Sequence, residues 1–394
     1  IDNDCVSEII IPDKLFNGVL IINSKTGDLI SRISTYNMFS YYNCISVADI
    51  NLDGIPEISI IASDLFLNPS NIQGRLLCYN INGNLIWVSD QRVDFSMKNG
   101  ATGIFGVPAF ADFNQDGIPE LYISNKIFNG LTGIKLADGE DNGIGAEFRS
   151  NFSVAPLSVA ANLDENPMDL ELAAGYTIYK VTITNLNGIA GNSMKATNFQ
   201  IDNSLRDGFT AVADINDDGI LDVVVTSPGI SNEAILYSYT YDKGIPKLIA
   251  KSYPPTLDLP TIGVPVIGDI SGLGKPSILF TRPSRILAYS YNGTSFFNQE
   301  WTHVTTDSSG MTGLTVFDFN FDGAQEIVYR DMSALTILNG AIILPTVMAK
   351  LACYSGTLME NPIVGDIDNS GHAKICVVCS SLSNQFDGHL TISG

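Results

Sequence analysis

The sequence predicts an all-β fold that is assembled from repeated units of four short strands. Tyr, Phe, Ile, Val, Asn and Gly are frequent, whereas helix-forming residues never build a long periodic stretch. An acidic motif recurs along the whole chain, and every copy stands between the same kinds of short apolar run. Such a repeat indicates one supersecondary unit used many times.

The bulk composition limits the partners that the protein can have. Apolar residues make up 45% of the 394 residues, and the net charge is −21. A chain with this negative charge is unsuited to binding nucleic acid or anionic membrane surfaces, because both bind clustered Lys and Arg. The most apolar segment, residues 334–354, is interrupted by Asn339, Gly340, Pro345 and Lys350, and it predicts two strands around a turn. We therefore expect no nucleic-acid partner and no membrane insertion.

The motif first appears complete as ADINLDGIPEI at residues 48–58. Close copies begin at residues 111, 213 and 317, with the sequences ADFNQDGIPEL, ADINDDGILDV and FDFNFDGAQEI. Weaker copies begin at residues 161, 268 and 365, with the sequences ANLDENPMDLEL, GDISGLGKPSI and GDIDNSGHAKI. At the N-terminus, Asp2, Asp4 and Glu8 fit the third, fifth and ninth loop positions of an eighth copy. Eight units correspond to about 49 residues each.

Each unit predicts four strands in a fixed order. A run of small residues precedes the loop, as at residues 106–111, and suits a crowded innermost strand. A β-branched run follows the loop, as at residues 57–62. A third run leads into a turn with Asn-Gly, Thr-Gly or Lys-Gly, where glycine supplies the positive φ of a tight hairpin, and a fourth run follows. Residues 19–30, 76–87 and 286–297 show this turn with its flanking runs.

Four strands in 40–50 residues are typical of a β-propeller blade, because β-helix coils are shorter and sandwich domains are longer. We predict a propeller of eight four-stranded blades, with seven blades as the alternative if the two terminal pieces share one. The sequence begins within a loop and stops near the third hairpin of its last unit. We therefore expect residues 1–394 to form a single propeller domain that is a fragment of a longer chain.

The loops between the first and second strands carry the ligands that a hard cation requires. Ca²⁺ takes six to eight oxygen atoms from carboxylates, amides and backbone carbonyls. The loop places side-chain oxygens at positions one, three and five, a backbone carbonyl at seven and a carboxylate at nine, with glycine at six for the bend. Four copies are intact, and we predict about four Ca²⁺ sites. Their ligands are Asp49, Asn51, Asp53, Ile55 and Glu57; Asp112, Asn114, Asp116, Ile118 and Glu120; Asp214, Asn216, Asp218, Ile220 and Asp222; and Asp318, Asn320, Asp322, Ala324 and Glu326.

Three copies depart from this pattern. The copy at 269 has an apolar residue at position five, and we expect it to hold no ion. The copy at 366 has Lys at position nine, and we expect weak binding or none. The copy at 162 is interpreted as a shortened loop, whose occupancy the sequence leaves open. Positions one, three, five and nine are Asp269, Ser271, Leu273 and Ser277; Asp366, Asp368, Ser370 and Lys374; and, in the shortened copy, Asn162, Asp164, Asn166 and Asp169.

These loops, with stretches before them such as GIFGVPAFADFNQDG at residues 103–117, resemble the FG-GAP or VCBS repeat of the integrin α-subunit propeller. The resemblance covers essentially the whole chain. It implies one Ca²⁺ per intact loop, held between the first and second strands of a blade. The last unit, GDIDNSGHAKICVV, also looks like the propellers in large secreted surface proteins of Bacteroidota, including type IX secretion cargo and gliding adhesins.

The sequence shows no catalytic motif in a fitting context, and its three histidines, His303, His372 and His389, are scattered. We therefore expect a non-catalytic adhesion, ligand-binding or structural module whose partners are a protein or glycan of the cell surface or matrix and other domains of the same chain. Sites with dissociation constants on the order of 10⁻⁴–10⁻³ M fill only outside a cell, which indicates secretion. The alternatives are a lectin-like glycan binder and a polysaccharide lyase, since rhamnogalacturonan lyases resemble this plan.

Six cysteines occur: Cys5, Cys44, Cys78, Cys353, Cys376 and Cys379. Cys376 and Cys379 have a zinc-like spacing but fall in a strand-like run, where residues three apart point to opposite faces. We interpret the cysteines mainly as small buried apolar residues. One or two disulfides remain open for a secreted protein, and the sequence leaves their pairing undecided.

Overall fold

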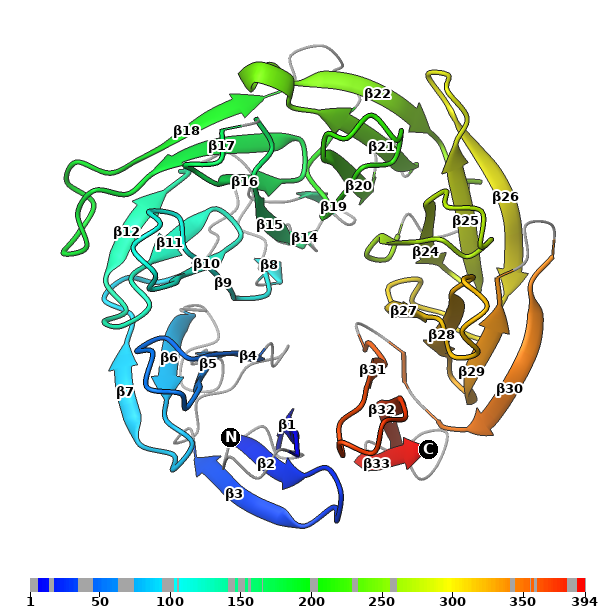
Figure 1. Ribbon diagram of the computed structural model, residues 1–394, viewed down its shortest axis with the longest axis horizontal. Helices are drawn as coiled ribbons and strands as arrows, with labels where there is room; N and C mark the ends of the chain where they lie inside the picture. The colour runs from blue at the N-terminus through cyan, green and yellow to red at the C-terminus, as the bar shows by residue number, and fades with distance from the viewer. Residues whose placement is uncertain are drawn as a thin grey trace. The chain divides into compact units, whose positions relative to one another are not determined.

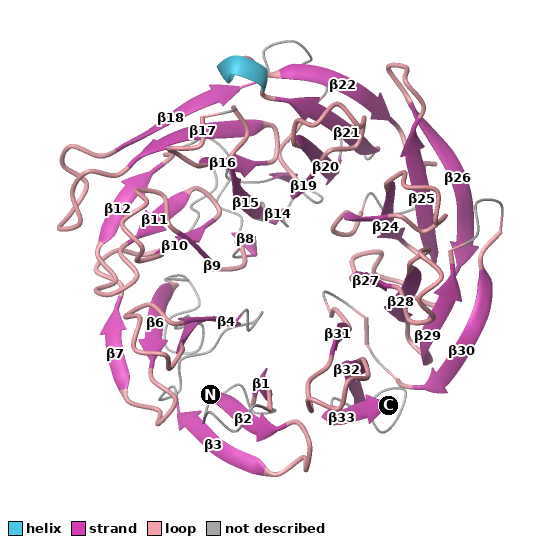
Figure 2. Cartoon of the chain, in the orientation of Figure 1, coloured by secondary structure: helices cyan, strands magenta, loops and turns pink. Residues whose placement is uncertain are grey.

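The structure is a computed structural model in which the chain divides into two compact units, one built mainly from residues 1–198 and the other mainly from residues 199–394. Strands dominate both units, and one short 3₁₀ helix, η1 (Asp242–Gly244), is drawn in Figure 2. Among the described residues, no helix is long and apolar enough to cross a membrane. The described residues are 6–13, 18–34, 45–62, 74–93, 103–104, 106–140, 146–147, 153–154, 157–164, 166–198, 205–228, 233–255, 261–340, 344–354, 356–357, 360–380 and 388–393.

Apart from one small sheet, the first unit consists of antiparallel sheets whose strands follow one another in chain order (Figure 1). A three-stranded sheet contains β1 (Glu8–Pro12), β2 (Gly18–Asn23) and β3 (Leu29–Ser34). Three four-stranded sheets contain β4 (Ile45–Ala48), β5 (Glu57–Ala62), β6 (Arg75–Tyr79) and β7 (Leu85–Val88); β9 (Ala109–Ala111), β10 (Glu120–Ile123), β11 (Lys126–Phe128) and β12 (Lys135–Asp138); and β15 (Ser158–Ala161), β16 (Glu171–Ala174), β17 (Thr177–Thr182) and β18 (Ser193–Asn198). A small extra sheet, which the repeat does not predict, joins β8 (Gly103–Ile104), β13 (Ala146–Glu147) and β14 (Ser153–Val154).

The second unit repeats the same plan. Its three four-stranded sheets contain β19 (Phe209–Ala213), β20 (Asp222–Pro228), β21 (Ala234–Thr240) and β22 (Lys247–Ser252); β23 (Val266–Gly268), β24 (Ser277–Arg282), β25 (Arg285–Tyr291) and β26 (Phe297–Val304); and β27 (Leu314–Phe317), β28 (Glu326–Arg330), β29 (Ala334–Asn339) and β30 (Thr346–Ala352). A three-stranded sheet contains β31 (Ile363–Gly365), β32 (Lys374–Ser380) and β33 (Gly388–Ser393).

These sheets are β-propeller blades, as the sequence predicts, but the preferred blade count is wrong. Six sheets among the described residues have four strands, so eight complete blades are not present. The first terminal sheet lacks an innermost strand, and the last lacks an outermost strand, in the part of the chain that is described. The count observed is the alternative of seven.

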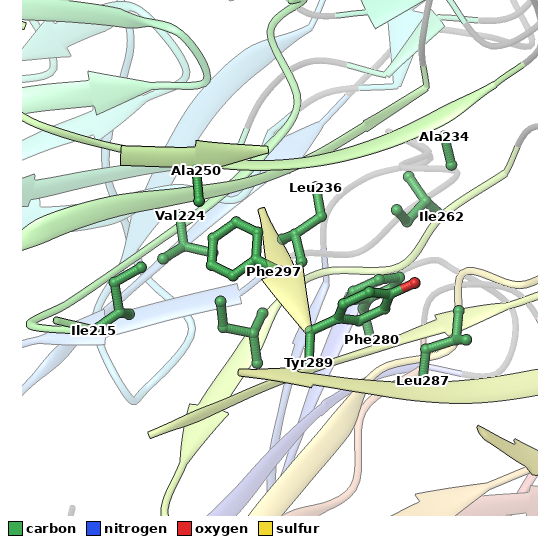
Figure 3. Packing of buried hydrophobic residues seen from close by; sticks show 11 residues of the cluster. Ile215, Val224, Ala234, Leu236, Ala250, Ile262, Phe280, Leu287, Tyr289 and Phe297 are labelled. Atoms are coloured by element: carbon green, nitrogen blue, oxygen red, sulfur yellow. The ribbon is translucent and has the colours of Figure 1, made fainter. Parts of the chain in front are cut away.

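The core lies between the faces of neighbouring blades, which explains why a middle strand such as β21 is buried along its whole length. All seven residues of β21 are buried, because a sheet inside a stack has no face toward water. In Figure 3, Phe297, Tyr289 and Phe280 of one blade meet Val224 and Leu236 of the preceding blade. This packing favours β-branched and aromatic residues over an alternating pattern.

One contact between neighbouring blades shows why the turn between β11 and β12 contains glycine. Trp87 on β7 lies against Gly133 of the next blade, where an added Cβ would stand 2.4 Å from the indole ring. The indole Nε1 donates to the carbonyl of Gly130 at 2.9 Å. Gly133 also has a φ of 71°, which only glycine adopts without strain.

The disulfide pairing, which the sequence leaves undecided, is decided for one bond. Cys353, directly after β30, is bonded to Cys379 on β32, and thus links two neighbouring blades. Cys78 and Cys376 are buried free thiols, as expected of small apolar residues. Cys5 and Cys44 lie outside the described residues.

Candidate metal centres

The four intact loops each join the first and second strands of a blade, where the repeat predicts them. They connect β4 to β5, β9 to β10, β19 to β20 and β27 to β28. In each case the second strand begins at the residue expected to close the metal shell. These closing residues are Glu57, Glu120, Asp222 and Glu326.

The loop from Asp112 shows how the side-chain oxygens are held. Asp112 accepts hydrogen bonds from the backbone N–H groups of Asp116 at 3.1 Å and Gly117 at 2.8 Å. Asn114 Oδ1 accepts from Asp116 N at 2.9 Å, and Asp116 Oδ1 accepts from Ile118 N at 2.8 Å. Each side chain at positions one, three and five is therefore turned into the loop by the backbone that follows it.

The carboxylate at position nine completes the hydrogen bonding of this loop. Glu120 is buried, its Oε2 accepts from the N–H of Phe113 at 2.9 Å, and its Oε1 accepts from Asn114 Nδ2 at 3.2 Å. Burial, followed by repulsion from Asp116 and Asp112, raises the pKa of Glu120 to about 7. An anionic group whose charge is disfavoured by its surroundings gains from a neighbouring cation.

The other three loops repeat the same bonds. The glycine N–H at position six reaches the first Asp at 2.8 Å in the loops of Asp49 and Asp214 and at 3.0 Å in that of Asp318. The closing carboxylates accept from Ile50, Ile215 and Phe319 at 3.1, 3.1 and 2.8 Å, in that order. Burial is also the main cause that raises the pKa of Asp222 to about 7 and raises the pKa values of Glu57 and Glu326.

Two buried carboxylate oxygens in these loops are suited to binding a cation. Asp222 Oδ1 and Asp318 Oδ1 are buried and accept no hydrogen bond, within the part of the chain that the structure describes. A buried carboxylate oxygen without a donor is costly, and a hard cation would satisfy it. The donor set of carboxylates and an amide oxygen therefore suits Ca²⁺. Ligation through the carbonyls of Ile55, Ile118, Ile220 and Ala324 stays a prediction.

The backbone of the loop is held in the left-handed region at two positions. Position six is always glycine, with φ from 83° to 88° in the four intact copies. Position four adopts similar angles without glycine, with φ from 57° to 61° at Leu52, Gln115, Asp217 and Phe321. Single residues tolerate this region when neighbouring hydrogen bonds hold them there.

The loop from Asn162 differs from its prediction. Ala161 pairs with Glu171, as Ala48 pairs with Glu57 and Ala111 with Glu120. Glu171, rather than Asp169, therefore occupies the closing position, and the loop is one residue longer instead of shorter. Asp169 follows from the sequence only if the loop is one residue shorter, whereas counting back from the buried strand finds Glu171.

That same loop brings three carboxylates together in the described part of the chain. One oxygen each of Asp164, Asp169 and Glu171 lies within 4.8 Å of the others. Lys180 on β17 approaches Asp169 at 3.1 Å and supplies a positive charge there. The ammonium group of Lys180 thus lies beside the carboxylates of this loop. No described contact places a Lys or Arg in this position in the intact loops.

The remaining copies keep the turn and change the closing group. Asp269 accepts from Gly274 N at 2.6 Å, and Asp366 accepts from Gly371 N at 2.8 Å. At the ninth position, Ser277 donates to Glu300 at 2.9 Å, and Lys374 stands in the place of a carboxylate. At the N-terminus, Glu8 begins β1 as predicted, whereas Asp2, Asp4 and Cys5 lie outside the described residues.

The two histidines whose side chains are described, His303 and His372, belong to different sheets or loops. His303 Nε2 and the hydroxyl of Tyr329 lie 3.0 Å apart, and burial lowers the pKa of this imidazole. His372 lies in the last loop, where its carbonyl accepts from Lys374 Nζ at 3.3 Å. Nothing is described of the His389 side chain.

Comparisons with known proteins extend to the fold and no further. No protein-family model matches the sequence, and no curated protein matches it. Among solved structures, the chain is similar to the biofilm matrix protein Bap1 of V. cholerae, with 15% identity, a TM-score of 0.44, and coverage of 99% of this chain and 75% of that one. It is also similar to rhamnogalacturonan lyase YesW, with 14% identity, a TM-score of 0.39, and coverage of 91% of this chain and 62% of that one. Neither likeness bears on what this chain binds or catalyses.

Proposed function

We propose that this chain is a non-catalytic, calcium-stabilised propeller module of the FG-GAP or VCBS type. One observation carries the proposal: four loops on different blades hold the same oxygen atoms in the same hydrogen bonds above a buried closing carboxylate. A catalytic site occurs once per domain, whereas these loops repeat from blade to blade. A repeated feature of the scaffold indicates a structural role.

The bound ion would supply positive charge to carboxylates that the fold brings close together. Glu120 and Asp222 have pKa values raised to about 7, so the calcium-free fold holds them at a cost near neutral pH. Asp112 and Asp214, at position one, would bind the ion while keeping the bend closed. Calcium would therefore tie the first strand of each blade to its second.

We further propose that the module works outside the cell, as part of a large secreted or cell-surface protein. Extracellular calcium modules bind with dissociation constants on the order of 10⁻⁴–10⁻³ M, which only extracellular calcium satisfies. The disulfide between Cys353 and Cys379 fits an oxidising compartment. Its partner would be a protein or glycan of the cell surface or matrix.

Calcium stoichiometry tests the structural part of this proposal. Equilibrium dialysis against ⁴⁵Ca²⁺ should give about four bound ions per chain. Glu120→Gln should remove one of them, while Ser277→Ala, at the same position of a degenerate loop, should remove none. A chain that binds no calcium at millimolar concentration would overturn the proposal.

A glycan array, read with and without calcium, tests the ligand. Specific calcium-dependent binding would assign a lectin-like role, and its absence together with capture of a surface protein would assign an adhesion role. Incubation with pectic polysaccharide provides the control for catalysis. Unsaturated sugar products that disappear in Glu120→Gln or in chelator would replace the non-catalytic proposal with a lyase.

A further inference from the structure

The degenerate loop of Asp269 lies directly against the intact loop of Asp318. These loops lead into β24 and β28, the second strands of two neighbouring blades (Figure 1). The backbone N–H of Gln325 donates to the carbonyl of Asp269 at 2.8 Å. Gly272 faces Ala324, where an added Cβ would stand 3.4 Å from the alanine Cβ. The two loops are therefore joined by a hydrogen bond and by packing.

The backbone is packed closely around Gln325 on both sides. A Cβ added to Gly268 would stand 2.2 Å from Gln325 Oε1. A Cβ added to Gly340 would stand 2.6 Å from the Cβ of Ile270 and 3.2 Å from the carbonyl oxygen of Gln325. Glycine is therefore required at these two positions for the chains to approach one another. The same packing keeps the N–H of Gln325 directed at its acceptor.

Asp269 is the residue on which the degenerate loop is built. Its carboxylate accepts from the backbone N–H groups of Ser271 at 3.1 Å, Leu273 at 3.3 Å and Gly274 at 2.6 Å. Its carbonyl accepts the N–H of Gln325, so that bond does not compete with the bonds of the carboxylate. A restraint on the backbone of Asp269 therefore restrains the whole turn.

Gln325 stands between two predicted calcium ligands of its own loop. Ala324 precedes it and offers the carbonyl at position seven, and Glu326 follows it and offers the carboxylate at position nine. Glu326 is buried, and its Oε2 accepts from the N–H of Phe319 at 2.8 Å. A cation held by this loop would restrain the residues on both sides of Gln325.

The equivalent contact between the loops of Asp49 and Asp112 lacks this hydrogen bond. Pro119 stands at the position of Gln325, and its carbonyl also lies against a glycine, Gly130. Proline has no N–H, so it cannot donate to the preceding loop. The hydrogen bond thus occurs where the preceding loop has lost its ligands, and it is absent where both loops keep theirs.

We propose that Gln325 is a positioning residue through which calcium in the loop of Asp318 stabilises the degenerate loop of Asp269. This inference rests on the proposed function, because it requires the loop of Asp318 to bind calcium. An ion held on both sides of Gln325 fixes its N–H, and this N–H in turn fixes the carbonyl of Asp269. The two loops are coupled, so the degenerate loop opens less often when its neighbour is filled.

Hydrogen exchange of the 394-residue protein, followed by mass spectrometry with and without millimolar Ca²⁺, measures this coupling. In the parent protein, calcium should slow exchange in residues 318–326. It should also slow exchange in residues 269–277, by about fivefold or more.

Two substitutions of Gln325 test the hydrogen bond itself. Gln325→Pro removes the N–H and introduces the residue found at position eight of three other loops, namely Pro56, Pro119 and Pro276. It should abolish the calcium effect in residues 269–277 and keep it in residues 318–326. Gln325→Ala keeps the N–H and should respond to calcium like the parent protein.

Two substitutions at position nine separate this coupling from a general gain in stability. Glu326→Gln should remove the calcium effect from residues 318–326 and from residues 269–277. Asp222→Asn makes the matching change in the blade that precedes the degenerate loop. It should remove the effect from residues 214–222 and leave it in residues 269–277.

A parent protein in which calcium slows exchange in residues 318–326 but not in residues 269–277 would overturn this inference alone. Full slowing of residues 269–277 in Gln325→Pro, or its loss in Asp222→Asn, would overturn it as well. No calcium effect in residues 318–326 would overturn both the inference and the calcium site proposed for that loop.

Discussion

The loop of Asp112 and the loop of Asp269 have the same backbone bend but differ in the residue at position nine. In both, the first Asp accepts the N–H of the sixth-position glycine, at 2.8 Å from Gly117 and at 2.6 Å from Gly274. Both glycines are left-handed, with φ of 88° and 72°. The ninth position, however, is Glu120 in one loop and Ser277 in the other.

The pKa values of Glu120 and Asp269 shift in opposite directions. Burial is the main cause that raises the pKa of Glu120 to about 7. Burial also acts to raise the pKa of Asp269, but hydrogen bonds from Gly274, Ser271 and Leu273 outweigh it and hold that pKa below its usual value. The degenerate loop is therefore satisfied by its own backbone, whereas the intact loop holds a carboxylate that a cation would relieve. The first Asp makes the turn in both loops, and we expect the residues at positions five and nine to decide whether the loop binds an ion.

Removal of calcium should have the largest effect. Each intact site should contribute about 2.7 kcal/mol to the free energy of unfolding at a hundredfold excess of calcium over its dissociation constant. Scanning calorimetry in millimolar Ca²⁺ and in excess chelator should show a steep loss of melting temperature. An unchanged melt in chelator would contradict the role given to the intact loops.

Alanine substitutions at position one should distinguish the two loops by the calcium dependence of their stability. Asp112→Ala and Asp269→Ala should each cost about 1–3 kcal/mol in chelator, because each leaves loop N–H groups without their acceptor. In saturating calcium, Asp112→Ala should cost about 2.7 kcal/mol more, and Asp269→Ala should cost no more than before. Urea titrations under both conditions measure the difference. Equal calcium dependence of the two variants would contradict the distinction.

Restoration of the lost ligands should convert the degenerate loop. The double variant Leu273→Asp, Ser277→Asp should bind one additional Ca²⁺ and gain at most about 2.7 kcal/mol in calcium alone. Leu273→Asn, Ser277→Asn is the matched control with the same shape and no added charge. Isothermal titration counts the sites, and a stoichiometry equal to that of the parent would show that the residues at positions five and nine do not decide binding.

A pH effect from outside the loops should be the smallest. Burial lowers the pKa of His303 in the fold, so this imidazole takes up a proton less readily folded than unfolded. Its contribution to stability should therefore be present above about pH 6.5 and be lost as the pH falls toward the lowered pKa of the folded state. The denaturant midpoints at pH 8 and pH 5, in saturating calcium, should differ less in His303→Gln than in the parent. Identical pH dependence of the two proteins would exclude this contribution.

Most of the strand order within a blade could be predicted from the sequence, because it depends on residues close together in the chain. A closing residue at a fixed distance from the first Asp predicts where the second strand begins, and β5, β10, β20 and β28 all begin there. The loop at Asn162 was misjudged because one inserted residue has no local signature. Its correct length follows only from the pairing of Ala161 with Glu171.

The sequence by itself determined the repeat, the four-stranded blades and the side chains around each loop, since hydrophobic patterning and turn chemistry act within a few residues of the chain. Tertiary structure alone decided the pairing of Cys353 with Cys379 and the burial that raises the pKa values of Glu120 and Asp222. Each of these depends on which strand of one blade faces the next. That relation joins residues far apart in the chain, and no local pattern encodes it.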